Sequence, residues 1–357
     1  MARRFLICFI ASFAIAISAA AQTAPPKIGV LMPFTGEIAP IAEKARKGFA
    51  LAEEEYAGRV KIVYEDIGGL GAAKAVTAAV KLLEIDRVSV IVGPFGPEQT
   101  IPVAAVAAKK GISLISFTLC SRAFVRMKNL FCGYPSIPKQ LEAMRGVLAA
   151  KKLDSLAVVT EESEFGNESG AGVAALAEKL RVAVPLKTAV PASDRDLRSV
   201  VAQVVRARPK AVFVAFGDPA MAFAFLKQLW DGGFRGTRFA FIDYDDKYLR
   251  QFGKFTDGLL VPGAFTGGYR PEYLERYRAH YQEEPDVYSA QAYDLLRTAL
   301  RAFEANGWSG KALEAKVPGL DYSDTAIAGF RFTADRSVDF PMGVLVAQQG
   351  RFVSYPH

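Results

Sequence analysis

The sequence predicts an α/β protein built as two lobes, each around a parallel sheet. Short apolar runs rich in Val, Ile and Phe alternate along the chain with longer amphipathic segments. The runs show no polar alternation, as expected for strands that are covered on both faces. Strand–helix–strand spacing of this kind gives right-handed crossovers and parallel pairing. With 357 residues, the chain is too long for one ordinary core and comfortable for two.

The chain begins with the pattern of a secretory signal, residues 1–21. Arg3 and Arg4 precede a largely apolar run, Phe5–Ile17, and three alanines then offer small residues at the cleavage positions before Gln22. The run would span about 20 Å as a helix, which is too short for a hydrocarbon core of about 30 Å. We therefore expect an exported protein located in the periplasm, with the signal removed near residue 21.

The elements follow in a regular order after the signal. Buried strands are expected at Ile28–Met32, Val60–Tyr64, Val88–Val92, Ser113–Ser116, Ser155–Val159, Ala211–Phe216, Phe239–Ile242 and Leu259–Val261. Helices are expected at Ile38–Glu55, Ala72–Leu83, Pro97–Lys109, Pro138–Ala150, Gly166–Leu180, Asp194–Arg206, Pro219–Trp230, Pro271–Gln282 and Val287–Asn306. The C-terminal stretch, Gly329–Phe332 and Val344–Val353 with a turn at Gln348–Gly350, is typical of a hairpin.

Two segments are expected to join the lobes. Tyr134–Pro138 carries two prolines that stiffen the chain before a new helix, and Pro262–Gly268 precedes a change to a helical pattern. The number of crossovers is too large for one compact lobe, so we place a hinge at the first of these segments and a second crossing at the other.

Composition argues against several classes of function. The chain has only two histidines, His280 and His357, so a Ser-His-Asp or Cys-His pair and a zinc centre lack their usual residues. It has no nucleophile elbow, metal-ligand cluster or phosphate loop. We therefore expect no catalytic residue, metal or cofactor. The net charge of +7 is spread along the chain without a basic run, which argues against nucleic-acid binding.

Two loops that follow strands are the best candidates for a ligand site, because such loops line the crevice of open α/β sheets. In Gly93–Thr100, Gly96 fits an N-cap and Pro97 the first helical position. The amides of Glu98 and Gln99 would then favour a carboxylate or another anion. An ordinary helix start capped by water is the alternative, and the local sequence alone favours it.

The next loop carries Phe117 and Thr118. Either the hydroxyl and backbone groups of Thr118 face a ligand, or this segment is a simple turn. Cys120 and Cys132 remain after removal of the signal. In an oxidising compartment such a pair favours a disulfide, and two buried thiols that never meet are the alternative.

Five stretches, in order, resemble the leucine/isoleucine/valine-binding protein family, the periplasmic solute receptors of ABC importers. They are Ile28–Gly36, Val88–Pro94, Gly111–Ser116, Gly217–Gln228 and Val287–Asp294. The resemblance implies the type I periplasmic binding protein fold, two α/β lobes joined by three crossing strands, the third near Ala326–Phe330. It divides the chain into a first lobe of residues 22–136 plus 266–328 and a second lobe of residues 137–265 plus 329–357.

The family pocket transfers to this chain only in part. Amino-acid-binding members hold the ligand carboxylate with a hydroxyl residue where this chain has Pro97. The next pocket loop, which supplies a carbonyl and a threonine hydroxyl, reads Thr118 and Cys120 here, and an aromatic in the first loop becomes Ile41. Because proline has no donor and a thiol is a weak one, these departures argue against a standard α-amino acid as the ligand.

On the second lobe, the resemblance implies that Phe165 takes the place of a tyrosine that covers the ligand; a core ring is the alternative. Asp218 either accepts from a ligand donor or caps the helix that begins at Pro219. Asp243 lies where a carboxylate faces the ligand amine in amino-acid-binding members, or else pairs with a neighbouring cation at the surface. The aromatic wall is completed by Tyr244, Phe265 and Tyr288.

The resemblance implies a monomeric receptor of the branched-chain amino acid type. It would capture a small carboxylate-bearing solute, amino-acid-like or an aromatic acid, by hinge closure and deliver it to a membrane permease. An exported ligand sensor on the same fold is an alternative. An exported carboxylate-based hydrolase that uses Asp218 or Asp243 is a second alternative.

Overall fold

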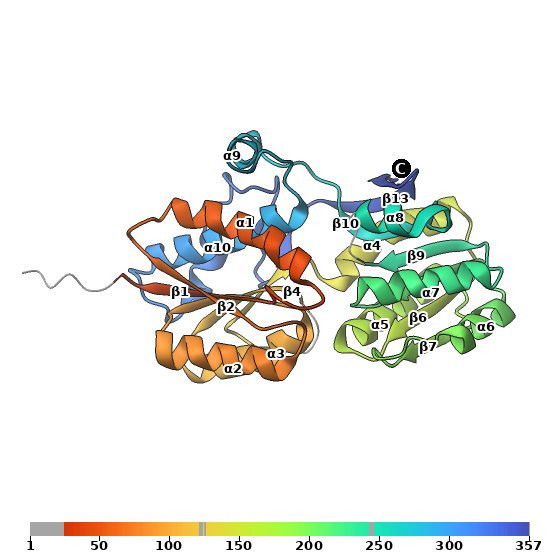
Figure 1. Ribbon diagram of the computed structural model, residues 1–357, viewed down its shortest axis with the longest axis horizontal. Helices are drawn as coiled ribbons and strands as arrows, with labels where there is room; N and C mark the ends of the chain where they lie inside the picture. Colours follow the sequence, from red (N-terminus) through yellow and green to blue (C-terminus); the bar gives the residue numbers. More distant parts are fainter. Residues whose placement is uncertain (1–24, 121–123, 125, 243–245, 357) are drawn as a thin grey trace, which may run out of the picture.

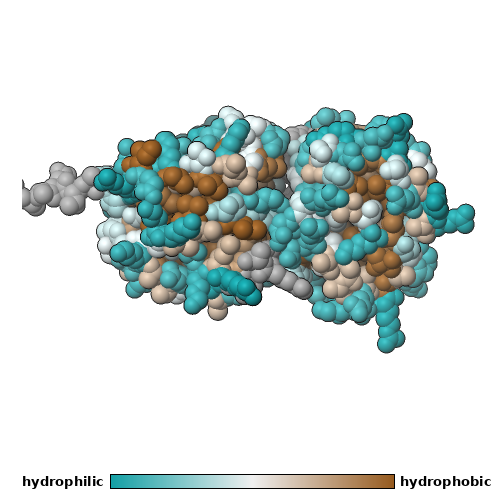
Figure 2. All heavy atoms as spheres, turned by 90° about the horizontal axis from the view of Figure 1, so that it is seen from below, coloured by the Kyte–Doolittle hydropathy of each residue, from teal (hydrophilic) through white to brown (hydrophobic). Residues whose placement is uncertain are grey.

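The structure, a computed structural model, describes residues 25–120, 124, 126–242 and 246–356. The predicted signal segment and the predicted site residues Asp243 and Tyr244 lie outside the described residues. The chain forms two lobes, each with helices on both faces of a sheet (Figure 1). A space-filling view from below shows the same two bodies with a largely hydrophilic surface (Figure 2). Among the described residues, no helix is long and apolar enough to cross a bilayer.

The first lobe is built on a five-stranded parallel sheet in the order β2-β1-β3-β4-β5. Its strands are β1 (Lys27–Met32), β2 (Lys61–Asp66), β3 (Val90–Phe95), β4 (Ser113–Leu119) and β5 (Leu130–Tyr134). Its helices are α1 (Ala39–Glu54), α2 (Ala72–Val80) continued by a π-helical turn (Lys81–Asp86), α3 (Pro97–Lys109), α9 (Pro271–Tyr281) and α10 (Val287–Ala305), with short 3₁₀ turns at Leu313–Ala315 and Val317–Gly319.

The second lobe is built on a seven-stranded sheet in the order β14-β13-β10-β9-β8-β6-β7. Its strands are β6 (Leu156–Glu161), β7 (Lys187–Val190), β8 (Ala211–Ala215), β9 (Thr237–Phe241), β10 (Leu260–Phe265), β13 (Met342–Gln348) and β14 (Arg351–Ser354). Its helices are α4 (Ile137–Ala150), α5 (Glu164–Leu180), α6 (Arg198–Ala207), α7 (Pro219–Asp231) and α8 (Asp246–Phe252), followed by a 3₁₀ turn at Gly253–Thr256.

Alternating strand residues build two cores in each lobe, which is why the strands read as continuous apolar runs. In β1, Val30 packs with α1 and α10 on one face of the sheet, while Leu31 packs with α2 and α3 on the other. In β6, Val159 packs with α6 and α7, and Val158 packs with α4 and α5. Strands of a parallel sheet are buried on both faces. Because helices cover both faces here, a ligand site can form only at the ends of the strands.

The chain passes between the lobes three times. It leaves the first lobe between β5 and α4, and returns after β10 along residues 266–270. That return segment runs antiparallel to residues 326–328: Arg270 N donates to Ala326 O at 2.9 Å, and Ala328 N donates to Gly268 O at 3.0 Å. The last passage leads into β13, which pairs with β10 in the second lobe.

The aromatic residues between positions 330 and 340 bear on where the last passage between the lobes lies. Phe330, Phe332 and Phe340 pack in the core of the first lobe, and β13 begins only at Met342. Aromatic side chains at 330–340 therefore hold this segment to the first lobe past the predicted crossing at Ala326–Phe330. We propose that the boundary between the lobes lies at Pro341 rather than at residue 329.

The predicted elements are present with ends shifted by a few residues, and others were missed. The C-terminal hairpin is formed by β13 and β14, with Gln349 and Gly350 at φ of +51° and +74° in its turn. Residues 329–332 are not part of it, because β11 (Arg331–Phe332) pairs with β12 (Val338–Asp339) in a separate two-stranded sheet. Strands β5 and β7 have no counterpart in the sequence prediction.

Candidate ligand-binding site

The carboxyl ends of strands from both sheets meet at one cavity of about 640 Å³. The first lobe contributes the loops that follow β1 and β2, the ends of β3, β4 and β5, and the starts of α1, α3 and α10. The second lobe contributes the loops that follow β6, β7, β8 and β9, and the middle of β10. Crevices at the carboxyl ends of parallel strands are where open α/β sheets bind ligands, and this volume is typical of a small-molecule site.

The walls of the cavity are largely aromatic. Rings come from both lobes: Phe95, Phe117, Tyr134, Phe165, Phe216, Phe241 and Tyr288. Phe165 and Phe241 lie 6.4 Å apart between ring centroids on the second lobe, and Phe95 and Tyr288 lie 6.4 Å apart on the first. Ile38 and Ile41, at the start of α1, add aliphatic surface. Such walls favour a flat or bulky apolar ligand body.

The N-terminus of α3 opens on the cavity. Gly96 precedes the helix with φ of +89°, a conformation that glycine adopts without strain, and Pro97 occupies the first helical position as predicted. Gly96 has no side chain to cap the helix, so the amide groups of the first turn stay available to a ligand. Gly96, Pro97 and Glu98 all line the cavity.

Glu98 also joins the two lobes across the cavity. Its Oε1 accepts a hydrogen bond at 3.3 Å from the backbone N–H of Phe165, in the first turn of α5. The same helix is capped by Ser163, whose hydroxyl accepts from Gly166 N at 3.0 Å. The first turn of α5 is thus satisfied within the protein, in contrast to that of α3.

Glu161 is a buried carboxyl group in the wall of the second lobe. It ends β6, is 7% exposed, and accepts from the Ser163 hydroxyl at 2.8 Å. Burial raises the pKa of Glu161, and the negative charges of Glu98 and Asp218 add to the rise, while hydrogen bonds from Gly217 and Ser163 oppose it. Glu161 therefore offers the cavity a buried carboxyl acceptor with a raised pKa, which suits a hydroxyl or amine donor.

Asp218 acts as the N-cap of α7, the role that the sequence left as one of two. Its Oδ1 accepts from Ala220 N at 2.9 Å, and Oδ2 lies 3.6 Å from an Arg195 guanidinium nitrogen. Both side chains line the cavity, and Arg195 brings a positive charge to a cavity that also holds Glu98 on the first lobe and Glu161 on the second. Because Arg195 is 65% exposed, this ion pair contributes little to stability.

The structure brings most of the predicted site residues together at this cavity: Gly96, Pro97, Glu98, Phe117, Thr118, Phe165, Asp218 and Tyr288. Thr118 is buried and its hydroxyl donates to Leu119 O at 3.3 Å. Ile41, which replaces a family aromatic, is also in the lining. Their contact with a ligand stays a prediction.

Three predicted site residues lie elsewhere. Gln99 is buried away from the cavity lining and donates from Nε2 to Gly69 O at 2.7 Å, because the helix turns it toward the neighbouring loop. Phe265 packs in the first lobe's core, 5.2 Å from the Tyr269 ring, since a register shift between Pro262 and Ala264 redirects the end of β10. Cys120 forms a disulfide with Cys132, with a Cα–Cα separation of 5.3 Å.

The cavity also has lining residues that the sequence did not single out: Ile38, Tyr134, Gln140, Glu161, Arg195, Phe216, Gly263 and Gln291. Gln140 and Gln291 hold the passage between β5 and α4, since their amide groups donate to Pro135 O and Gly133 O respectively. Within the described part of the chain, no three His, Cys, Asp or Glu side chains form a group that could hold a metal ion.

Among solved structures, the fold resembles a leucine-binding protein from Thermotoga maritima, with a TM-score of 0.84, 18% identity and coverage of 93% of this chain and 98% of that one. It also resembles a solute-binding protein of an ABC transporter from Rhodopseudomonas palustris in complex with 4-hydroxybenzoate, with a TM-score of 0.82, 15% identity and coverage of 93% and 96%. At these identities the structures establish the likeness of the fold.

The sequence itself is 23% identical to a leucine-, isoleucine-, valine-, threonine- and alanine-binding protein of Pseudomonas aeruginosa, covering 95% of this chain and 94% of that protein. Residues 25–351 match the sequence profile of the family described as periplasmic binding protein. This match spans both lobes and the cavity between them, and it confirms the resemblance carried by the five sequence stretches. The chain belongs to the periplasmic binding protein family.

Proposed function

We propose that this protein is the exported solute receptor of an ABC importer of the branched-chain amino acid type. It would bind a small carboxylate-bearing solute with an aromatic or bulky apolar body. The observation that carries this proposal is a ring-lined cavity between two lobes, with the uncapped first turn of α3 on one wall. A binding role needs no chemical step, which agrees with the composition of the chain.

The charges around the cavity support an orientation for the solute. The first-turn amides of α3 suit a carboxylate, with about 0.3–1 kcal/mol from the helix dipole in addition to direct hydrogen bonds. The buried Glu161 on the opposite lobe suits a hydroxyl or amine at the other end of the solute. Each ring face that covers the solute adds about 0.5–1.5 kcal/mol beyond the contribution of its buried area.

Closure about the three passages would complete the site. The solute would meet Gly96–Glu98 and Thr118 on the first lobe, and the second lobe would then bring Phe165 and Glu161 over it. The Glu98–Phe165 hydrogen bond supports this geometry, because it links the lobes at the cavity. We further propose that residues 1–21 direct export to the periplasm and that a membrane permease receives the solute.

The relatives support the class of solute. The Pseudomonas protein is named for branched-chain and small amino acids, and the Rhodopseudomonas structure holds 4-hydroxybenzoate. Pro97 stands where amino-acid-binding members are expected to carry a hydroxyl residue, and seven rings line the cavity. We therefore favour an aromatic acid with a second polar group over an aliphatic amino acid.

A thermal-shift screen of the purified mature protein tests the proposal. The probes are 4-hydroxybenzoate, benzoate, L-leucine and L-phenylalanine, with glucose as the uncharged control. A solute with a Kd of about 10 µM, present at about 1 mM, stabilises the native state by about 2.7 kcal/mol, which raises the melting temperature by several degrees. We expect the largest shift with 4-hydroxybenzoate and a smaller one with benzoate, which lacks the donor. A shift with glucose alone would contradict the proposed class of solute.

A further inference from the structure

The disulfide between Cys120 and Cys132 joins the ends of two strands that form the cavity. Cys120 directly follows β4, whose last residues, Phe117, Thr118 and Leu119, line the cavity. Cys132 lies within β5, two residues before Tyr134, which also lines it. The covalent link therefore lies beside the part of the first lobe that would hold the solute.

The strand pairing is irregular at the same place. β4 and β5 pair in register from Leu114 to Ser116, which lies opposite Cys132, and the register then shifts before Leu119 pairs with Tyr134. Residues 117 and 118 fall within this shift and lack regular pairing with β5, although Phe117 pairs with Phe95 of β3 on the other side of the strand. The disulfide closes the loop between the two strands immediately after the irregular stretch. It thus adds a covalent link between β4 and β5 two residues after Thr118, where their backbone pairing is irregular.

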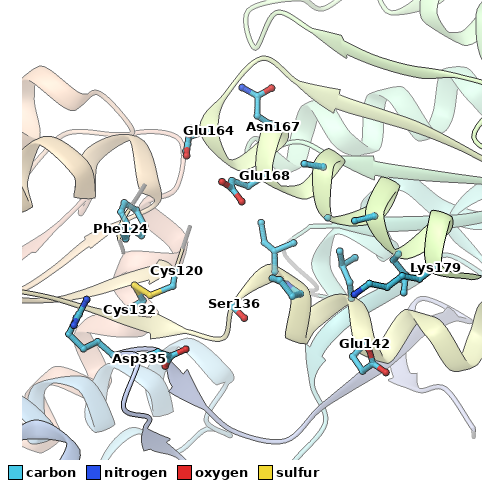
Figure 3. Close-up of a pocket in the computed structure, with 18 of the residues that line it drawn as sticks. Cys120, Phe124, Cys132, Ser136, Glu142, Glu164, Asn167, Glu168, Lys179 and Asp335 are labelled. Carbon is cyan, nitrogen blue, oxygen red and sulfur yellow. A yellow bond between two sulfur atoms is a disulfide. The ribbon is translucent and has the colours of Figure 1, made fainter. Parts of the chain in front are cut away.

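One sulfur of this bond is reachable from a second hollow. A groove of about 960 Å³ lies between the first lobe and helices α4 and α5, and its lining includes Cys120 and Cys132. Figure 3 shows the disulfide on one side of this groove, with Glu164 and Glu168 of α5 on the other. Cys120 is half-buried whereas Cys132 is fully buried, so a reductant meets the sulfur of Cys120 first.

We propose that the Cys120–Cys132 bond is a redox-sensitive positioning element of the solute cavity. This proposal rests on the proposed function. A thiolate of an external dithiol attacks Cys120 Sγ, the Cys120–Cys132 bond breaks, and Cys132 leaves as a thiolate that takes up a proton. The second thiol of the reductant then displaces Cys120 as a thiol. Two electrons pass from the dithiol, which becomes a cyclic disulfide, and the cavity wall at residues 117–119 loses its restraint.

Hydrogen exchange on the solute-free protein tests the positioning role without any solute. After reduction with dithiothreitol and alkylation, we expect amides in residues 117–119 and 130–134 to exchange at least tenfold faster than in the oxidised protein. Amides of β6 and β8 in the second lobe should be unchanged, and reoxidation of a reduced, unalkylated sample should restore the slow rates. Unchanged exchange at residues 117–119 would overturn the proposal.

Binding of 4-hydroxybenzoate by calorimetry provides the second readout. We expect the reduced protein and the C120S/C132S variant to bind this probe at least fivefold more weakly than the oxidised protein, and dithiothreitol to have no effect on the variant. Equal affinities would overturn the proposal. If the oxidised protein does not bind 4-hydroxybenzoate, the proposed solute is wrong, and the exchange measurement still decides the role of the disulfide. Reduction of the wild type covers the case in which the variant fails to fold.

Discussion

Asp294 on α10 is the side chain whose replacement should most disturb the passage between the lobes. It is 1% exposed, and its two carboxylate oxygens accept from the backbone N–H groups of Ala326 and Ile327 at 2.6 and 2.9 Å. These two amides belong to residues 326–328, which run antiparallel to the return segment, residues 266–270. In Asp294→Asn, the side-chain oxygen keeps one of the two backbone N–H groups and the NH₂ group faces the other, so that one buried N–H loses its acceptor and the new NH₂ group has none.

The magnitude follows from those two donors. An orphaned buried donor costs about 1–3 kcal/mol, and a small shift of the segment recovers part of it, so we expect Asp294→Asn to lower the free energy of unfolding by about 2–4 kcal/mol. Urea titration followed by circular dichroism measures this difference. Asp321→Asn is the matched control, because Asp321 also accepts two hydrogen bonds, from Ser323 N and its hydroxyl, but lies at the surface. It should cost less than about 1 kcal/mol.

The same comparison has a pH dependence. Burial raises the pKa of Asp294 to about 8 from 3.8, although both backbone hydrogen bonds and Arg297 oppose the rise. The folded state then binds the proton more tightly than the unfolded state. The stabilisation linked to this proton is full below about pH 4 and is lost as the pH rises through about 8. We expect Asp294→Asn to cost more at pH 5 than at pH 8.5. The reasoning would be refuted if Asp294→Asn and Asp321→Asn lowered the free energy of unfolding equally. It would also be refuted if Asp294→Asn lowered this free energy more at pH 8.5 than at pH 5.

Three further perturbations probe the cavity and the packing. Phe165→Ala should weaken binding of the solute found by thermal shift at least tenfold, which corresponds to about 1.4 kcal/mol. The melting temperature of the solute-free protein should stay nearly unchanged. If calorimetry shows that the variant and the wild type bind the solute equally, the Phe165 ring is not part of the site. Glu98→Ala removes an exposed hydrogen bond between the lobes worth about 1 kcal/mol, which should move the solute-free protein about fivefold toward open forms. Small-angle scattering should show this as a larger radius of gyration, whereas Glu98→Gln keeps an acceptor and should match the wild type. In α1, a Cβ on Gly48 would lie 1.8 Å from Ser289 O, so Gly48→Ala should destabilise by at least about 1–3 kcal/mol. Gly146→Ala in α4 meets nothing within 4 Å and should be neutral or stabilising by about 0.5–1 kcal/mol in the same urea titration.

The helix starts nearest the cavity were the most predictable feature of the sequence. Pro97 and Pro219 each open a helix at the position predicted, because proline fixes a helical φ and lacks only an amide that the first turn leaves unpaired. The uninterrupted apolar runs likewise predicted parallel sheets. Two of the missed strands lack that signal: β7 is a four-residue edge strand with partly exposed residues, and β5 contains Gly133.

The side-chain directions within the cavity could not be predicted in the same way. Whether a residue at a strand end faces the cavity depends on register, and the register of β10 shifts between Pro262 and Ala264. Phe265 consequently joins the core of the first lobe, although the resemblance placed it on the aromatic wall. Glu161 carried no signal because a single acidic residue after a strand is common, and only the approach of Gly217 and Ser163 makes it a buried acceptor.

The distribution of the outermost strands has a practical consequence. The first described strand, β1, belongs to one lobe, and the last, β14, lies at the free edge of the other lobe's sheet. A fluorescent donor attached before Lys27 and an acceptor attached after Ser354 would therefore be fixed to different lobes, away from the cavity. Rotation of one lobe against the other would change the distance between the dyes, so, under the proposed hinge closure, energy transfer between them would report whether the cavity is occupied.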